Sequence, residues 1–156
     1  MQDEFQSAAP FYEETTRIFH LMNVGRFEEL NHLVDVHCSA VVPTSEKSSQ
    51  TCYLRDEWHR FLFEQIKTID ESEAPSDIKF IDYRAEDSDT MGWSLVHFYR
   101  AYTKGGQVRR KYYAATLLWK LFQDGWRAFH VHVSPDHIEK DDMAGTSDTR
   151  TKIFEF

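Results

Sequence analysis

This chain of 156 residues has little cysteine and no long apolar run, and each shortage excludes a class of protein. Cys38 and Cys52 are its two cysteines, and their spacing matches neither a metal-binding nor a redox motif. Two cysteines in a domain large enough to fold without disulfides indicate a reducing compartment, so we expect a cytoplasmic protein. No run approaches the roughly 20 apolar residues of a membrane-spanning helix, and no apolar segment follows a basic start as in a secretory signal. We therefore expect neither a membrane partner nor secretion.

Glycine and proline are also scarce, with 6 and 4 residues, which argues against long irregular loops within the fold. Positive charge is in short supply as well, because the formal net charge is −8. The dense basic run is Arg109-Arg110-Lys111, next to Gly105-Gly106, and this arrangement predicts a solvated hairpin loop. Nucleic-acid binding requires cations that displace phosphate counterions, so we expect no nucleic-acid partner. The sequence also lacks a P-loop, a nucleophile elbow and a glycine-rich dinucleotide motif.

What the chain does contain is enough apolar material for one folded domain. Hydrophobic residues make up 41% and aromatic residues 15%, which supports a core and argues against disorder. We expect a flexible N-terminus over residues 1–10, one domain over 11–135 and a polar tail over 136–156. The final residues, 153–156, alternate like a strand, and two alternatives stay open for them: addition to a neighbour's sheet edge, or fraying in solvent.

The first half of the chain has mainly helical periodicity. Apolar residues fall on one face between about Phe11 and Asn23, and Gly25 is expected to end this helix. The other elements expected in this half are a helix over Arg26–Val36, a short strand over Ala40–Val42, a polar loop over 44–51 and a helix over Leu54–Ile69.

From residue 78 the apolar period changes to that of strands. Strands are expected over Ile78–Glu86, Gly92–Thr103, Arg110–Phe122 and Trp126–Ser134. The last two runs are joined by Gln123-Asp124-Gly125, a turn sequence typical of a β-hairpin. Helices followed by a strand meander predict an α+β domain with a curved antiparallel sheet.

Several of these segments, taken together and in order, resemble one family. They are the helix segment His59-Arg60-Phe61-Leu62-Phe63-Glu64, the hairpin segments Thr116–Trp119, Asp124–Trp126 and Phe129–His132, and Gly25-Arg26-Phe27-Glu28. Over residues 11–135 the chain resembles the association (hub) domain of calcium/calmodulin-dependent protein kinase II, within the nuclear transport factor 2-like (SnoaL-like) superfamily. The resemblance implies a cone-shaped, cystatin-like fold in which a curved antiparallel sheet wraps around the N-terminal helices. It also implies self-association.

The chain departs from that family in its pocket. The family lines a deep pocket with arginines that can hold a carboxylate, whereas Leu117, Val133 and Phe98 stand at those positions here. Arg100 lies two residues beyond Phe98, so strand alternation returns it to the same face. We expect Arg100 to contact a ligand, to pair with Glu64 inside the domain or to lie at the rim, and these alternatives stay open. The candidate pocket residues are His59, Phe63, Phe98, Arg100, Leu117, Trp119, Phe129 and Val133.

The histidines of the last strand raise a second question. His130 and His132 are two residues apart, so they share a face, and His97 on the neighbouring strand could complete a metal site. The resemblance implies instead that this face is the outer one, where subunits pack. We therefore predict no metal and no cofactor, and the candidate interface residues are Tyr99, Trp126, His130 and His132.

Two enzymatic functions are alternatives to self-association. Ketosteroid isomerase-like chemistry needs a carboxylate base and oxyanion donors, but the expected positions near Ile18, Val41–Pro43 and Leu117 are apolar. Dehydratase-type pairing of His59 with His97, Asp82 or Asp87 stays open. We assign no catalytic residue. We predict a homo-oligomer in which dimers assemble into a ring, with a small-molecule-binding protein or a related isomerase or lyase as the alternative.

Overall fold

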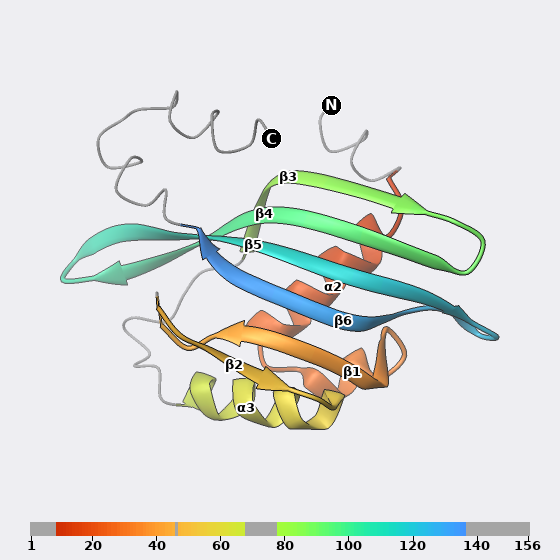
Figure 1. Cartoon of the computed structure of the whole chain (residues 1–156). Helices are drawn as coiled ribbons and strands as arrows, with labels where there is room; N and C mark the ends of the chain where they lie inside the picture. The colour runs from red at the N-terminus through yellow and green to blue at the C-terminus, as the bar shows by residue number, and fades with distance from the viewer. Residues whose placement is uncertain (1–8, 46, 68–77, 137–156) are drawn as a thin grey trace.

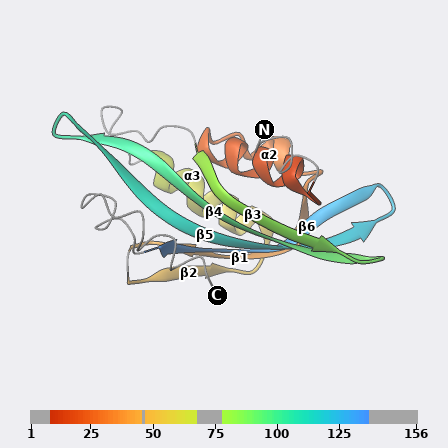
Figure 2. The ribbon, with the colours of Figure 1, turned by 90° about the horizontal axis from the view of Figure 1, so that it is seen from above.

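The computed structural model describes residues 9–45, 47–67 and 78–136, which form one six-stranded sheet with helices on one side of it (Figure 1). The elements are α2 (Tyr12–Asn23), η1 (Phe27–Leu30), β1 (Val34–Pro43), β2 (Ser49–Cys52), α3 (Arg55–Lys67), β3 (Ile78–Asp87), β4 (Met91–Lys104), β5 (Gln107–Phe122) and β6 (Gly125–Asp136). Seen from above, the sheet is bent and both α-helices lie on the same side of it (Figure 2). We call that side the inner face and the opposite, helix-free side the outer face.

The sheet order is β2-β1-β6-β5-β4-β3. Strands β3 to β6 form the expected antiparallel meander, while β1 pairs in parallel with β6 and antiparallel with β2. The expected α+β class with a curved sheet is confirmed. In the described part of the chain, every helix is too short or too polar to cross a membrane.

Helix α2 forms as its periodicity predicts. Ile18 and Phe19 are buried against the sheet, and the opposite side of the helix is polar and exposed. The chain reverses at Gly25, which has a φ of 76°, and the Arg26 amide then donates to the Leu21 carbonyl at 2.9 Å. The left-handed conformation favours glycine, so the expected helix end is confirmed.

The expected helix over Arg26–Val36 is wrong. Only the short helix η1 forms there, and β1 begins at Val34. The Ala128 amide donates to the Leu33 carbonyl at 2.8 Å, and the following residues pair with β6 in the interior of the sheet. This non-local pairing favours an extended chain, which suits the β-branched Val34 and Val36 better than a helix does.

Two loop expectations also need correction. Residues 49–51, expected within a loop, belong to strand β2 along the edge of the sheet. The run Arg109-Arg110-Lys111 is exposed as expected but lies on β5, because the tight turn of this hairpin is made by Gly105 and Gly106.

A β-bulge in β6 decides which of its side chains face the helices. The ladder pairs Leu118 with His130 but Trp119 with Ala128, so Phe129 is an extra residue on β6. Residues before the bulge therefore have the opposite parity from those after it. Trp126 contacts the core and Ala128 is buried on the inner face, whereas His130 and His132 lie on the outer face.

Candidate functional site

A cavity of about 190 Å³ lies between helices α2 and α3 and the inner face of the sheet. Its wall is mostly apolar, and Arg100 supplies the charged group among the described lining residues. The lining residues are Phe19, Met22, Asn23, Val42, Pro43, Phe61, Leu62, Ile78, Phe98, Arg100, Tyr113 and Val133. An apolar pocket with a single strongly polar group is the usual form of a small-molecule site.

Arg100 lies at the sheet side of this cavity because it follows Phe98 on the inner face of β4. Burial lowers the pKa of its guanidinium, and the nearby Tyr113 opposes that shift. Its Nε atom is buried and has no hydrogen-bond partner among the described residues. Glu64, one of the alternatives for pairing with Arg100, is exposed and is not among the residues that line the cavity. A cation with an unused donor in an apolar cavity favours a bound anion such as a carboxylate.

The structure brings together three of the predicted pocket residues, namely Phe98, Arg100 and Val133. Leu117 and Trp119 lie on the same face but are fully buried in the core, away from the cavity. The Trp119 Nε1 atom donates to Ser94 Oγ at 2.9 Å, and its ring stacks on Phe11 at 4.9 Å between ring centroids. Both residues therefore stabilise the core and do not line the cavity.

His59 and Phe63 lie elsewhere, in a second and more open hollow between η1 and α3. The His59 ring contacts Phe27 and Trp58, with ring centroids 5.2 and 4.3 Å apart. Burial is the main reason that the pKa of His59 falls to about 4, so its imidazole is neutral at pH 7. Helix α3 adjoins both hollows, because Phe61 and Leu62 line the cavity and His59 and Phe63 line the second hollow.

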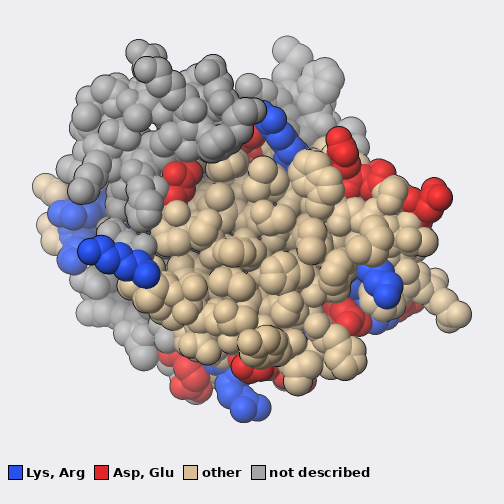
Figure 3. All heavy atoms as spheres, viewed as in Figure 1, with Lys and Arg blue, Asp and Glu red and all other residues tan. Residues whose placement is uncertain are grey.

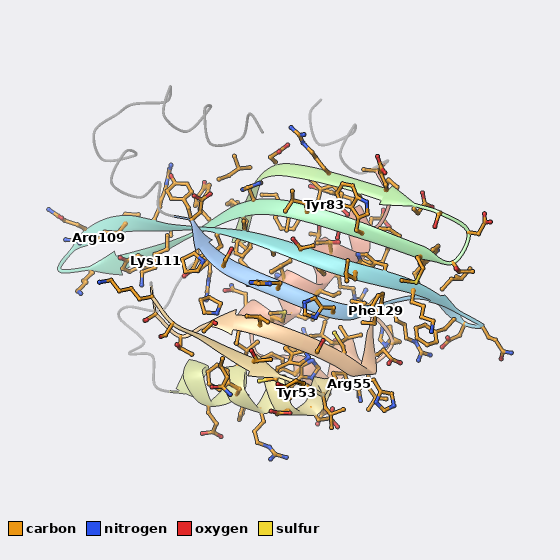
Figure 4. All side chains as sticks on the ribbon, in the orientation of Figure 1. Tyr53, Arg55, Tyr83, Arg109, Lys111 and Phe129 are labelled. Carbon is orange, nitrogen blue, oxygen red and sulfur yellow. The ribbon has the colours of Figure 1, made fainter. Side chains whose placement is uncertain are left out.

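Phe129, the remaining predicted pocket residue, is the extra residue of the bulge. Figure 4 labels it on β6. It is half-buried and does not belong to the core cluster or to the residues packed against it. Among the lining residues that the sequence reasoning missed, Tyr113 faces Phe98 across the ladder. Its place could have been predicted once the register of β4 and β5 was known.

The outer face carries the other group of candidates. Its centre is formed by side chains that alternate with the buried ones on three neighbouring strands: Leu95, His97, Tyr99, Thr116, Leu118, His130 and His132. The space-filling view shows this face with an uncharged centre and charged side chains near its rim (Figure 3). Tyr99, His130 and His132 therefore lie on the outer face, and their place in an interface stays a prediction.

Trp126 does not share that face. Its ring meets Phe11 edge-on at 5.1 Å on the inner side, because the bulge at Phe129 reverses the parity of β6. His130 Nδ1 is hydrogen-bonded to Ser39 Oγ at 2.7 Å, and burial together with the neighbouring His132 lowers the pKa of His130. Within the described ranges there is no group of three or more histidine, cysteine, aspartate or glutamate residues that could hold a metal ion.

The positions considered for enzymatic chemistry are dispersed. Ile18, Val42 and Leu117 are buried and apolar, so they offer neither a base nor an oxyanion donor. His59 lies on the helix side, whereas His97 lies opposite Asp82 on the outer face of the sheet. None of His97, Asp82 and Asp87 lines the hollow that contains His59, so the structure does not bring His59 together with them.

Comparisons with known proteins agree with this architecture. The family model of the calcium/calmodulin dependent protein kinase II association domain matches residues 11–137. The S. rosetta CaMKII hub superposes with a TM-score of 0.66 and 16% identity, covering 83% of this chain and 98% of that one. The association domain of C. elegans CaMKII superposes with a TM-score of 0.62 and 16% identity, covering 77% of this chain and 88% of that one. An NTF2-like protein of cystatin-like fold from Novosphingobium aromaticivorans superposes with a TM-score of 0.65 and 13% identity, covering 92% of this chain and 86% of that one.

At these identities the solved structures establish the fold alone. They confirm the expected nuclear transport factor 2-like, cystatin-like architecture. A search of curated proteins finds no match.

Proposed function

This chain belongs to the calcium/calmodulin dependent protein kinase II association domain family, and we propose on that basis that it is a non-catalytic self-association module. Residues 11–135 form the module. Two copies pair through their outer faces, and the dimers then assemble into a ring. Identical chains usually assemble with closed symmetry, which favours a ring over an open chain.

The uncharged centre of the outer face is the observation that carries this proposal (Figure 3). A six-stranded sheet in a single chain would normally alternate apolar side chains inward with charged side chains outward. Here Leu95, Tyr99, Thr116 and Leu118 occupy the outward positions of β4 and β5. The cores of protein interfaces are depleted in charge and enriched in aromatic residues, as this surface is.

The histidines of β6 fit the same role. The Ser39 hydroxyl holds His130 at 2.7 Å, and the His130 and His132 rings meet edge-on at 6.4 Å. Rings fixed in this way lose little conformational freedom on association, so they suit a contact surface. Tyr99 adds a third ring, which packs at 5.7 Å from Tyr112.

A charge placed in the centre of the outer face tests the proposal. Leu118 lies directly opposite His130 and outside the core cluster, so Leu118→Arg should leave the fold intact. We expect this variant to be monomeric by light scattering, because pairing would bury two unpaired guanidinium groups. Val24→Arg is the matched control, since Val24 is 49% exposed at the end of α2. A Leu118→Arg protein that keeps the wild-type mass, or a monomeric wild-type protein, would refute the dimer.

The cavity supports a second function, the binding of a small carboxylate. Arg100 supplies a buried guanidinium whose Nε atom has no partner among the described residues, and the surrounding wall is apolar. At about 190 Å³ the cavity suits only a molecule of a few heavy atoms. A thermal-shift screen of short carboxylic acids should reveal ligands, because binding to the folded state raises the melting temperature.

Arg100→Met gives the specific control for that screen. The shift produced by a carboxylate should vanish in this variant and persist in Val24→Arg, which leaves the cavity unchanged. A carboxylate that still shifts Arg100→Met as far as the wild type would show that binding occurs elsewhere. If no short carboxylate shifts the wild type, the ligand hypothesis fails while self-association stands.

A further inference from the structure

The two ends of the sheet carry opposite charge. At one end, the β4–β5 hairpin bears four exposed cations and no carboxylate between residues 101 and 111. The cations are Lys104, Arg109, Arg110 and Lys111. Figure 4 shows Arg109 and Lys111 on this hairpin, which projects beyond the rest of the sheet. This cluster of positive charge contrasts with the net charge of the chain, which is −8.

Two of these cations lie over aromatic rings. The Arg110 guanidinium lies 4.8 Å from the centroid of the Tyr99 ring, and the Lys111 ammonium lies 5.2 Å from that of Tyr102. Arg110 lies with Tyr99 on the outer face. Lys111 lies on the inner face, because its ladder partner Arg100 does. The positive charge therefore covers both sides of the hairpin. Within the described residues, no ion pair involves Arg109 or Lys111. The exposed Arg109 and Lys111 therefore give the hairpin positive charge at its surface.

The opposite end of the sheet is acidic. The β3–β4 turn carries Glu86, Asp87 and Asp89, all exposed. The Leu121 amide donates to the Thr90 carbonyl at 2.9 Å, which ties this turn to β5. Strand β4 connects the two ends, and at about 3.3 Å per residue its length separates them by about 45 Å. Opposite charges this far apart on one chain cannot neutralise each other within the molecule.

We propose that the basic hairpin of one copy docks against the acidic β3–β4 turn of a neighbouring copy. This inference rests on the proposed self-association and names the contact that joins one dimer to the next. A heterologous contact, in which two different patches of the chain meet, generates a ring when the rotation between neighbours closes. The two patches are complementary in charge, and Val108, 73% exposed near the turn, adds an apolar contact.

Screening sets the conditions under which this contact forms. Single exposed ion pairs contribute little, so several pairs must act together. At about 0.1 M salt the Debye length is about 10 Å and the opposed patches attract, whereas at about 1 M it is about 3 Å. Assembly of dimers should therefore weaken at high salt, while pairing through the uncharged outer face should not.

Charge reversal tests the contact directly. We compare masses at about 0.1 M salt by light scattering, and we expect a mass above the dimer for the wild type. The basic-end variant Arg109→Glu/Lys111→Glu and the acidic-end variant Glu86→Lys/Asp89→Lys should each fall to the mass of a dimer, with at least a tenfold weaker association of dimers. The charge-matched control Arg17→Glu/Lys47→Glu changes exposed cations on α2 and in the β1–β2 loop and should keep the wild-type mass.

Mixing the two single-end variants gives the decisive result. In the mixture, the acidic hairpin of the basic-end variant can meet the basic turn of the acidic-end variant. The native basic hairpin of the acidic-end variant can likewise meet the native acidic turn of the basic-end variant, so assemblies larger than a dimer should return. If both variants keep the wild-type mass, or if the mixture stays dimeric, the contact is wrong. A wild type that never exceeds a dimer also overturns it but leaves self-association intact, whereas a monomeric wild type overturns both.

A different partner would give a different pattern. If the basic-end variant keeps the wild-type mass and loses binding to a single-stranded RNA oligonucleotide, the hairpin recognises nucleic acid and the proposed contact is refuted. The net charge of −8 makes that outcome unexpected, since a nucleic acid would meet repulsion from the rest of the surface.

Discussion

Replacing Arg100 with methionine should make the protein more stable. Arg100 lines an apolar cavity, and burial lowers the pKa of its guanidinium. Its Nε atom is buried with no hydrogen-bond partner among the described residues. An unpartnered donor of this kind destabilises the folded state because the hydrogen bond to water is lost and not replaced. Methionine keeps the apolar stem of the side chain and removes the charge.

The size of the effect follows from that lost hydrogen bond. Leaving a buried polar group unsatisfied costs about 1–3 kcal/mol. Arg100 is half-buried and its cavity is open to solvent on one side, so the lower part of that range applies, about 1–2 kcal/mol. For a domain of this length, each kcal/mol shifts the melting temperature by about 2–4 °C. We therefore expect Arg100→Met to melt about 2–8 °C higher than the wild type.

Urea unfolding without added ligand measures the change. Wild type and variant are compared at equal protein concentration, because self-association makes apparent stability depend on concentration. Arg100→Lys is the companion variant, since it keeps a charge in the same place and should not be stabilised. A lower free energy of unfolding for Arg100→Met would mean that Arg100 is satisfied within the fold. Arg100 would then have no unused donor for a bound carboxylate.

Three other changes test the fold. In Gly92→Ala the new Cβ would lie 2.5 Å from two ring carbons of Phe11, so urea unfolding should show a loss of about 2–3 kcal/mol, whereas Gly105→Ala, with φ +59° and open space, should lose only about 1 kcal/mol. His59 has a pKa of about 4 instead of 6.5, so the unfolded state binds more protons between these values; stability should fall by up to about 3 kcal/mol as the pH drops from 6.5 to 4, and His59→Phe should lack this part of the pH dependence. Tyr83→Phe removes a hydroxyl that donates to a backbone carbonyl at 2.6 Å and should cost about 1 kcal/mol by the same measurement. Equal losses for both glycine variants would contradict the close packing of Gly92 against Phe11. A His59→Phe protein with the wild-type pH profile would contradict the lowered pKa of His59. A Tyr83→Phe protein as stable as the wild type would show that the Tyr83 hydrogen bond contributes no stability.

The elements with strong local signals were predictable. Helix α2 has an amphipathic period and ends at a glycine. The four strands from residue 78 are separated by turns that contain glycine or polar residues, and within each strand apolar and polar side chains tend to alternate. Strand β1 was not predictable in the same way. Its first residues pair in parallel with β6, nearly a hundred residues later, and no local period reports such a contact.

The candidate site divides along the same line. Alternation correctly puts Phe98 and Arg100 on one face of β4, because that strand is regular between them. On β6 alternation fails, since the bulge at Phe129 inserts one residue and reverses the parity of Trp126. A bulge depends on how two strands twist and pair, and a single strand's sequence carries no clear mark of it.

The sequence by itself determined the fold class, the helix and strand pattern of most of the domain, and the family to which the chain belongs. The fold class and the elements follow from apolar periodicity, and the family follows from short motifs and their order along the chain. Both can be recognised without knowing which distant residues are in contact. The tertiary structure alone decided that Arg100 faces a small apolar cavity, that His59 lies in a different hollow, and that the charged ends of the sheet point away from each other. The physical reason is that cavities and separated charges are properties of packed elements, set by the bend of the sheet and by the register of its strands.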